Sequence, residues 1–322
     1  MSLLSTHDLA IGYPGKPALQ KDLNLAVNQG QIISLMGQNG VGKTTFLKTI
    51  NGLLPVISGE VRMNGQSLEK LSRLEIAKDC ALVLTEKPAN HQLSVIDLVA
   101  MGRHPYSNWL GLLSQEDKTA VESAIHQTKI DYIAERKIGE LSDGQLQKVM
   151  IARALAQDTN LIILDEPVAH LDLNNKIEVM RLLREIAKQG KGILISTHDI
   201  QVTTQLSDEL WLFGFGTQVQ TGIPEDLILN GQLEKTLYLE HHHYDFVHHR
   251  LLNVASGPAI QLTGDEDVAY WTEQALVRAG YQVGASEIVV ECQSTSWSLQ
   301  NEDYSTIAGL IEGVRGVRNA EI

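Results

Sequence analysis

The sequence predicts an α/β fold with a mainly parallel sheet, followed by a small α+β unit. Short apolar runs at 31–36, 161–164 and 192–196 are typical of strands that are buried on both faces of a parallel sheet. Between the last two runs, apolar residues recur at helical spacing over 174–189, and Gly190 marks the end of that helix. This alternation of strand and helix predicts an α/β core.

Length, charge and cysteine content limit the possible classes of protein. A chain of 322 residues can hold one large α/β domain and a smaller one. The net charge of -13 argues against a broad nucleic-acid surface, so we expect no nucleic-acid partner. No apolar run approaches ~18 residues and the first residues lack a signal sequence, so we expect neither a membrane span nor secretion. Cys80 and Cys292 are expected to be free, buried thiols of a cytoplasmic protein.

A glycine-rich loop follows the first apolar run. Residues 37–44 read G-x-x-x-x-G-K-T, and the residues from Phe46 to Ile50 then read as a helix. In such a loop, backbone N–H groups surround phosphates and the helix directs its positive end at them. We expect Lys43 to reach the β- and γ-phosphates of a nucleotide and the Thr44 hydroxyl to bind Mg²⁺. The flanking strand and helix argue against a chance glycine loop.

Two carboxylates end the apolar run at 161–164. Asp165 can meet Mg²⁺ directly or through water, and Glu166 can orient or deprotonate an attacking water. An acidic pair at the end of a strand is common by itself. Here the phosphate-binding loop supplies the phosphates on which the pair would act, so the sequence predicts nucleotide hydrolysis.

The remaining segments predict an inserted helical region and an accessory domain. Residues 114–135 read as a helix with one polar face, and 240–250 are rich in histidine and mark a boundary. The C-terminal part alternates strand candidates at 259–262, 288–290 and 295–299 with helices at 265–279 and 304–314. The expected organisation is a nucleotide-binding domain at 1–239 with a helical subdomain at about 86–158, a linker at 240–257 and a small α+β domain at 258–322.

With these motifs in one fixed order, residues 3–238 resemble the ATP-binding subunits of ABC transporters. Leu141-Ser142-Asp143-Gly144-Gln145 is similar to the signature peptide of that family. The resemblance implies a P-loop NTPase core in which this peptide contacts the γ-phosphate of ATP held by the opposite subunit. Two ATP sites would therefore form in a head-to-tail homodimer.

Further positions match motifs of the same family. Residues 169–172 resemble its D-loop, which crosses the dimer interface, and His198 matches its switch histidine. Tyr13 lies where the family places an aromatic ring that stacks on adenine, and its distance upstream of Lys43 favours that role over an ordinary turn tyrosine. The resemblance thus implies Lys43, Glu166 and His198 as catalytic residues; Tyr13, Gly37, Asn39, Gly40, Gly42, Lys43, Thr44, Thr45, Ser142, Gly144, Gln145 and Asp172 as ATP contacts; and Thr44, Asp165 and Thr85 as Mg²⁺ ligands.

Two positions depart from the family pattern. Asp143 replaces a glycine of the signature peptide, and because a carboxylate repels phosphate we expect it to point away or to contact the loop. Where the family has the Q-loop glutamine, the register gives Thr85, followed by Glu86. Either the Thr85 hydroxyl takes that role or Glu86 rotates in, which leaves the rate and the coupling of hydrolysis open.

Residues 99–106 resemble a segment of importers of iron–siderophore complexes, haem and cobalamin, which carry a G-R-x-P pattern. The resemblance implies that Arg103 to Leu113 receives a membrane permease, with an apolar surface at Trp109, Leu110, Leu112 and Leu113. The same residues could instead pack on their own helical region, or do both. The chain would then be peripheral at the cytoplasmic face of the inner membrane, and an external substrate-binding protein would be an indirect partner.

Three alternatives stay open at this point. The histidines at 241–243 and 248–249 form either a metal site or, as we favour, a solvated linker or short strand, because metal ligands need fixed geometry. The C-terminal unit is either a ferredoxin-like or related module that senses a ligand or an appendage that enlarges the dimer. The alternative to import is a soluble, non-transport ABC ATPase that acts as a conformational switch.

Overall fold

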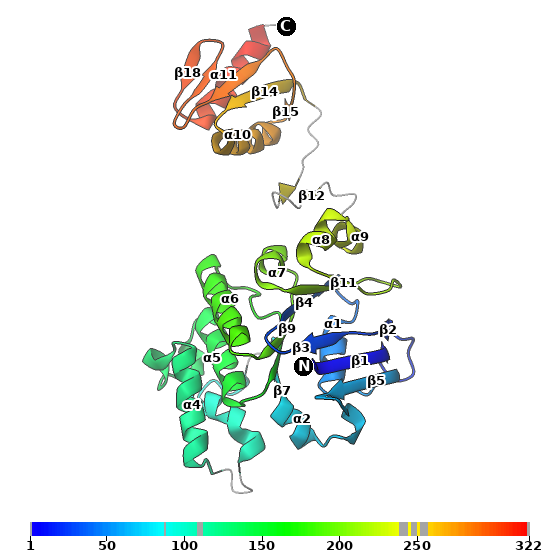
Figure 1. Ribbon diagram of the computed structural model, residues 1–322. Helices are drawn as coiled ribbons and strands as arrows, with labels where there is room; N and C mark the ends of the chain where they lie inside the picture. Colours follow the sequence, from blue (N-terminus) through cyan, green and yellow to red (C-terminus); the bar gives the residue numbers. More distant parts are fainter. Residues whose placement is uncertain are drawn as a thin grey trace. The chain divides into compact units, whose positions relative to one another are not determined.

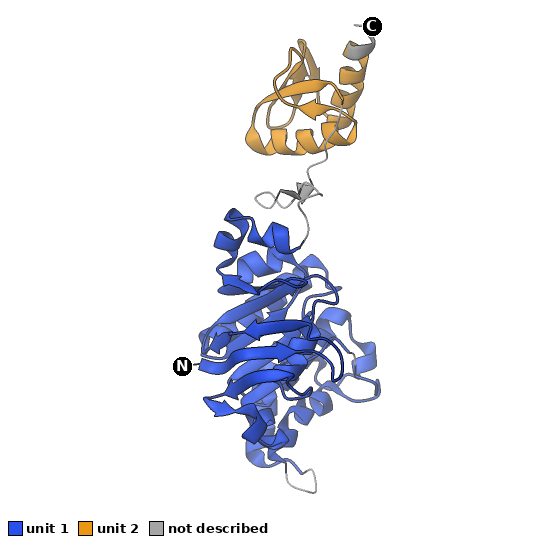
Figure 2. Ribbon diagram, turned by 90° about the vertical axis from the view of Figure 1, so that its right-hand side faces the viewer, with its two compact units in different colours: residues 1–238 blue, residues 239–322 orange. Residues whose placement is uncertain are grey.

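The computed structural model describes residues 2–86, 88–107, 112–237, 244–245, 250–251 and 257–320. The chain divides into two compact units, residues 1–238 and 239–322 (Figure 2). No helix of the described residues is long and apolar enough to cross a membrane.

A six-stranded sheet forms the centre of the first unit (Figure 1). Its order is β11-β10-β4-β9-β8-β7, and every neighbouring pair is parallel except β10 with the edge strand β11. All residues of β4, β8 and β9 are buried, which explains their continuous apolar sequence. The strands are β4 (Ile32–Gly37), β7 (Cys80–Val83), β8 (Leu161–Asp165), β9 (Gly192–Ser196), β10 (Glu209–Phe213) and β11 (Gln220–Gly222).

An antiparallel sheet, which the sequence analysis did not predict, packs with helix α1 (Lys43–Ile50) on one face of the central sheet. The ring of Phe46 on α1 meets the rings of Trp211 and Phe213 edge-on, with centroids 6.0 and 5.3 Å away. These contacts fix α1 against the central sheet, directly after β4. The antiparallel strands are β1 (Ser2–Ile11), β2 (Gln20–Leu23), β3 (Ala26–Asn28), β5 (Ser58–Met63) and β6 (Gln66–Ser67).

Helices cover the other face of the central sheet, where Ile162 and Leu164 of β8 share a core with them. The helix expected over 114–135 is shorter than predicted: it ends at Gln127, because Lys129 adopts a left-handed conformation with φ of 56°. A 3₁₀ turn at Asp131–Ile133 follows. The helices of this unit besides α1 are α2 (Arg73–Asp79), α3 (Val95–Ala100), α4 (Gln115–Gln127), α5 (Asp143–Ala156), α6 (Leu173–Lys188), α7 (Ile200–Leu206), α8 (Pro224–Leu229) and α9 (Gln232–Thr236).

The second unit is a five-stranded mixed sheet with two helices, so the expected α+β class is confirmed. Its strand order is β15-β14-β16-β17-β18, with β14 parallel to both neighbours. The topology differs from a ferredoxin-like one, because α11 follows all the described strands instead of connecting two of them. It does not decide between a related module that senses a ligand and an appendage that enlarges the dimer. The elements are β14 (Ala259–Gly264), α10 (Glu266–Arg278), β15 (Gln282–Val283), β16 (Val289–Cys292), β17 (Trp297–Leu299), β18 (Glu302–Tyr304) and α11 (Ile307–Ala320).

Ahead of β14 in the sequence, β12 (Tyr244–Asp245) pairs with β13 (Arg250–Leu251). The histidines at 241–243 and 248–249 lie outside the described residues, so the structure does not test the metal alternative. Cys80 and Cys292 are free and buried, as predicted.

Arg103 is a structural residue of the helical subdomain. It lies in a 3₁₀ helix, η2 (Met101–Tyr106), and is 8% exposed. Its Nε donates to Asp117 Oδ1 at 2.8 Å, and its guanidinium also donates to the Ala156 carbonyl at 2.9 Å. The ring of Tyr106 lies 4.0 Å below the guanidinium carbon. Arg103 therefore joins η2 to α4 and α5, while the neighbouring Trp109 and Leu110 lie outside the described residues.

Replacing Arg103 tests this role. We expect Arg103→Ala to lower the free energy of unfolding by about 3 kcal/mol, because it leaves the buried Asp117 carboxylate without its cation. Chemical denaturation measures the loss. Adding Asp117→Ala to the first change should recover part of it, and a single substitution that costs nothing would contradict the buried ion pair.

Candidate active site

The phosphate-binding loop connects β4 to α1 and depends on its glycines. Gly40 and Gly42 have φ of 85° and 109°, which other residues rarely adopt. A Cβ at Gly37 would lie 2.3 Å from the Phe213 carbonyl oxygen. The loop therefore turns tightly at the end of a buried strand, and the first N–H groups of α1 face the site without a side-chain cap.

Lys43 is held in this loop although its side chain carries a charge. The residue is 8% exposed, and its ammonium donates to the carbonyls of Gly37 and Gln38 at 2.7 and 3.1 Å. Burial lowers the pKa of Lys43, and the negative charges of Glu166 and Asp165 act in the opposite direction. The cation is thus fixed between the loop and the two carboxylates.

Asp165 joins the loop to the end of β8. One carboxylate oxygen accepts from the Thr44 hydroxyl at 3.2 Å, and the other accepts from the Ser196 hydroxyl. A hydroxyl oxygen and a carboxylate oxygen that lie this close together are suitable ligands for one Mg²⁺ ion. Sequence reasoning did not identify Ser196, although the parallel pairing of β8 and β9 sets it directly opposite Asp165.

Glu166 adopts a left-handed conformation with φ of 49°, and its amide donates to the Ser196 carbonyl at 2.9 Å. Its Oε1 is buried and accepts a hydrogen bond from no described residue. His198 Nε2 lies 3.0 Å from this oxygen, close enough for an ion pair but not aligned for a hydrogen bond. Burial raises the pKa of Glu166 to about 7, with Lys43 opposing, whereas burial and then Lys43 lower the pKa of His198.

These groups line one pocket of about 430 Å³. Tyr13, which is 47% exposed, stands at its edge, and Thr85 lines it from the segment after β7. The structure therefore brings together most of the residues that the sequence predicted for ATP and Mg²⁺. The lining is Tyr13, Leu19, Asn39, Gly40, Gly42, Lys43, Thr44, Thr45, Thr85, Asp165, Glu166 and His198.

Five other predicted residues, all within the described chain, do not line this pocket. One of them, Gly37, ends β4, and its carbonyl accepts a hydrogen bond from Lys43. Ser142 caps α5 and exchanges hydrogen bonds with Gln145, while Gly144 packs against Asn175 at the start of α6. Asp172 caps α6. Nearby, Asp143 lines an adjacent pocket of about 310 Å³ together with Glu86 and Glu166.

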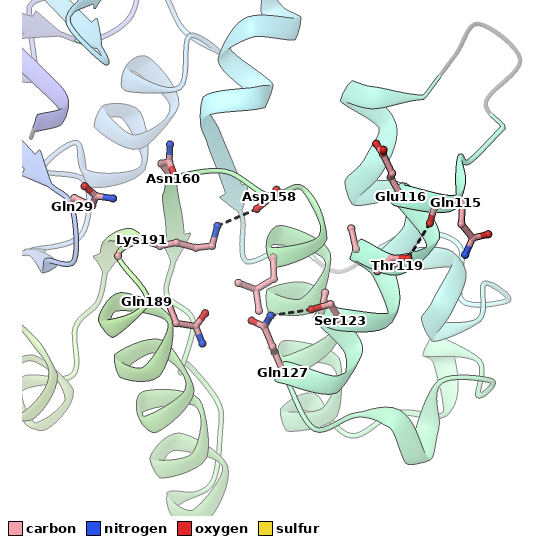
Figure 3. Close-up of a pocket in the computed structure, with 14 residues that line it drawn as sticks. Gln29, Gln115, Glu116, Thr119, Ser123, Gln127, Asp158, Asn160, Gln189 and Lys191 are labelled. Atoms are coloured by element: carbon pink, nitrogen blue, oxygen red, sulfur yellow. Dashed lines mark hydrogen bonds and ion pairs between the residues drawn. The ribbon is translucent and has the colours of Figure 1, made fainter.

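Figure 3 shows a larger pocket, of about 650 Å³, beside α4. Its described lining includes none of the predicted site residues and consists mainly of amide and hydroxyl side chains such as Gln127, Ser123 and Asn160. Lys191, which also lines it, is already bonded to the Thr159 carbonyl at 2.6 Å. The smaller pocket, with its buried charges, is therefore the candidate active site.

The raised pKa of Glu166 predicts a pH-dependent effect on stability. The folded protein binds this proton more tightly than the unfolded chain does, so the ionised carboxylate costs stability increasingly as pH rises from 4.5 to about 7. Glu166→Gln should therefore raise Tm by a few degrees at pH 8 and by much less at pH 5, in nucleotide-free protein with EDTA. Glu116→Gln on α4, an exposed position, is the control. An equal gain at both pH values would contradict the buried carboxylate.

Comparisons with known proteins identify the family of this chain. A family model described as ABC transporter matches residues 20–169, and one described as iron ABC transporter C-terminal domain matches residues 256–315. The iron(3+)-hydroxamate import ATP-binding protein FhuC of Bacillus subtilis is 37% identical over 241 residues, which cover 74% of this chain and 89% of that protein. The achromobactin transport ATP-binding protein CbrD of Dickeya dadantii is 36% identical over 239 residues, covering 74% and 88%.

Solved structures give the same assignment for the fold. The cbiO1 protein of Clostridium perfringens, part of the ABC transporter complex cbiONQ, aligns with a TM-score of 0.64 and 26% identity, covering 74% of this chain and 95% of that one. A nucleotide-free ATP-binding cassette of an ABC transporter aligns with a TM-score of 0.66 at 23% identity. The α/β core with its inserted helices and the added α+β domain is thus confirmed. By its sequence relatives and its fold, the chain belongs to the ATP-binding proteins of ABC transporters, which are ATPases.

Proposed function

We propose that this chain hydrolyses ATP to drive a membrane permease that imports iron–siderophore complexes, haem or cobalamin. The proposal is carried by the observation that one pocket is lined by all four of Lys43, Asp165, Glu166 and His198. The iron class is supported by the match to the iron transporter C-terminal domain and by relatives that are named for achromobactin and iron(3+)-hydroxamate transport. The non-transport switch has less support, because these relatives are transport proteins.

Each residue of the pocket has a role in this proposal. The loop N–H groups and Lys43 bind the phosphates, Tyr13 stacks on adenine, and Thr44, Asp165 and Thr85 hold Mg²⁺. Mg²⁺ held by these residues would neutralise negative charge on the transferred phosphoryl group. Glu166 accepts a proton from the attacking water through its buried oxygen, for which a pKa near 7 is suitable. His198, next to that oxygen, holds the water and the γ-phosphate in place.

The residues outside the pocket support a head-to-tail homodimer. Ser142 and Asp172 are exposed at the N-terminal ends of α5 and α6, and the next residue, Leu173, is 67% exposed. A second copy of the chain would bring Ser142, Gly144 and Gln145 to the opposite γ-phosphate and bury Leu173 at the interface. Each ATP would then be enclosed by both chains.

The surface around η2 supports a site for the permease within Arg103–Leu113 and its flanks. Because Arg103 is buried, exposed apolar neighbours would make the contact: Met101 is 53% exposed and Leu112 is 63% exposed. Helix α2, which carries Leu74 at 51% exposure, packs against η2. Attachment there would place the chain peripherally at the cytoplasmic face of the membrane, with the external binding protein as an indirect partner.

Uptake measurements test the function. In cells that contain the permease and binding protein, Glu166→Gln should abolish uptake of one radiolabelled compound among ferric siderophore, haem and cobalamin, because ATP is bound without being hydrolysed. Glu116→Gln at equal protein level should leave uptake unchanged. Normal uptake of all three by Glu166→Gln, with wild-type ATPase activity intact in vitro, would favour the non-transport switch.

Met101→Asp tests the permease surface. A carboxylate at this exposed apolar position should reduce copurification with the permease at least about tenfold while ATP binding stays unchanged. Leu229→Asp on α8, where the side chain is 81% exposed, is the matched control. If the Met101 variant copurifies as well as the control does, the permease binds elsewhere.

A further inference from the structure

We propose that Lys176 is a positioning residue for ATP hydrolysis, and that the first turn of α6 connects the signature peptide to His198 of the same chain. In this connection Gly144 packs against Asn175, Lys176 follows Asn175 in the chain, and Lys176 forms an ion pair with Asp199. The inference rests on the proposed dimeric ATPase, because the signature peptide is taken to contact ATP on the partner.

The first contact joins the signature peptide to α6. Gly144 is buried, and a Cβ there would lie 2.3 Å from Asn175 Cγ, so the Asn175 side chain fills the space above this glycine. The same side chain donates to Asp172 Oδ2 at 2.8 Å, and the Asn175 amide donates to Asp172 Oδ1 at 2.9 Å. A displacement of the signature peptide must therefore be accommodated by the first turn of α6.

The second contact joins α6 to the segment that carries His198. Lys176 directly follows Asn175, and its Nζ lies 2.7 Å from Asp199 Oδ2. The other carboxylate oxygen of Asp199 caps α7 by accepting from the Val202 amide at 3.1 Å. The Asp199 amide donates to the Thr197 hydroxyl at 3.1 Å. His198 thus lies between two residues whose positions this network fixes.

The last contact reaches the reacting centre, where His198 Nε2 is 3.0 Å from Glu166 Oε1. Lys176 is the cation that is bonded to Asp199. Without Lys176, the segment around His198 would lose this support.

An ordinary surface ion pair is the competing explanation. The Lys176 and Asp199 side chains are 30% and 23% exposed, and ion pairs of this kind contribute little to the stability of a folded chain. That explanation predicts no change in catalysis when Lys176 is replaced. The two explanations therefore predict different values of kcat for Lys176 variants but the same folding stability.

Steady-state ATPase kinetics of the full chain separate them. We expect Lys176→Ala to lower kcat about tenfold with KM for ATP changed less than about twofold, and Lys176→Arg to recover at least half of the loss. Lys176→Met, which keeps the aliphatic length, should behave like the alanine variant. Glu178→Gln breaks the ion pair between α6 and Lys148 and should leave kcat within about twofold of wild type.

The outcomes against the proposal are equally definite. A kcat within twofold of wild type for Lys176→Met, a rise in KM alone, or an arginine variant no better than alanine would overturn it. Light scattering with ATP in the Glu166→Gln background distinguishes this failure from that of the proposed dimer. If the Glu166→Gln protein dimerises both with and without Lys176→Met, the proposed dimer is retained and only the role of Lys176 is rejected. If the Glu166→Gln protein stays monomeric at saturating ATP, both the dimer and the role of Lys176 are overturned.

Discussion

The active site depends on burying one cation beside two carboxylates. Lys43 and Asp165 are 8% and 7% exposed, and such burial costs several kcal/mol for a group without partners. Lys43 therefore needs the carbonyls of its loop, and Asp165 needs the hydroxyls of Thr44 and Ser196. Asp165 ends β8, and the partners come from the ends of β4 and β9, from the loop and from α1. The order of the central sheet and the aromatic contacts of Phe46 therefore determine the geometry of the site.

Much of this could be predicted from the sequence because its signals are local. A strand buried on both faces leaves a continuous apolar run, and a phosphate-binding loop needs glycine, lysine and threonine at fixed spacing. Lys43, Thr44, Asp165 and Glu166 were assigned in this way, and the structure places all four in one pocket. The resemblance to a family added His198 and Tyr13, which line the same pocket.

The features that escaped prediction depend on contacts between distant segments. Strands β2, β3 and β5 of the antiparallel sheet mix exposed and buried residues, so they leave no continuous apolar run in the sequence. Lys129, just after the end of α4, adopts a left-handed conformation that its residue type does not predict. From the sequence, Arg103 would be assigned to the surface, but in the fold it is enclosed by α4 and α5. The ion pair of Lys176 with Asp199 joins residues on different elements, so no local pattern indicates it.

The second unit has a core of its own, in which Ile260, Val290, Cys292, Leu299 and Leu310 are buried among its helices and strands. Within the part of the chain that the structure describes, the two main cores of the first unit and the residues packed against them extend no further than Val219. Each described core is therefore built from residues of one unit. A core substitution in the second unit therefore alters packing in which no residue of the active-site pocket takes part.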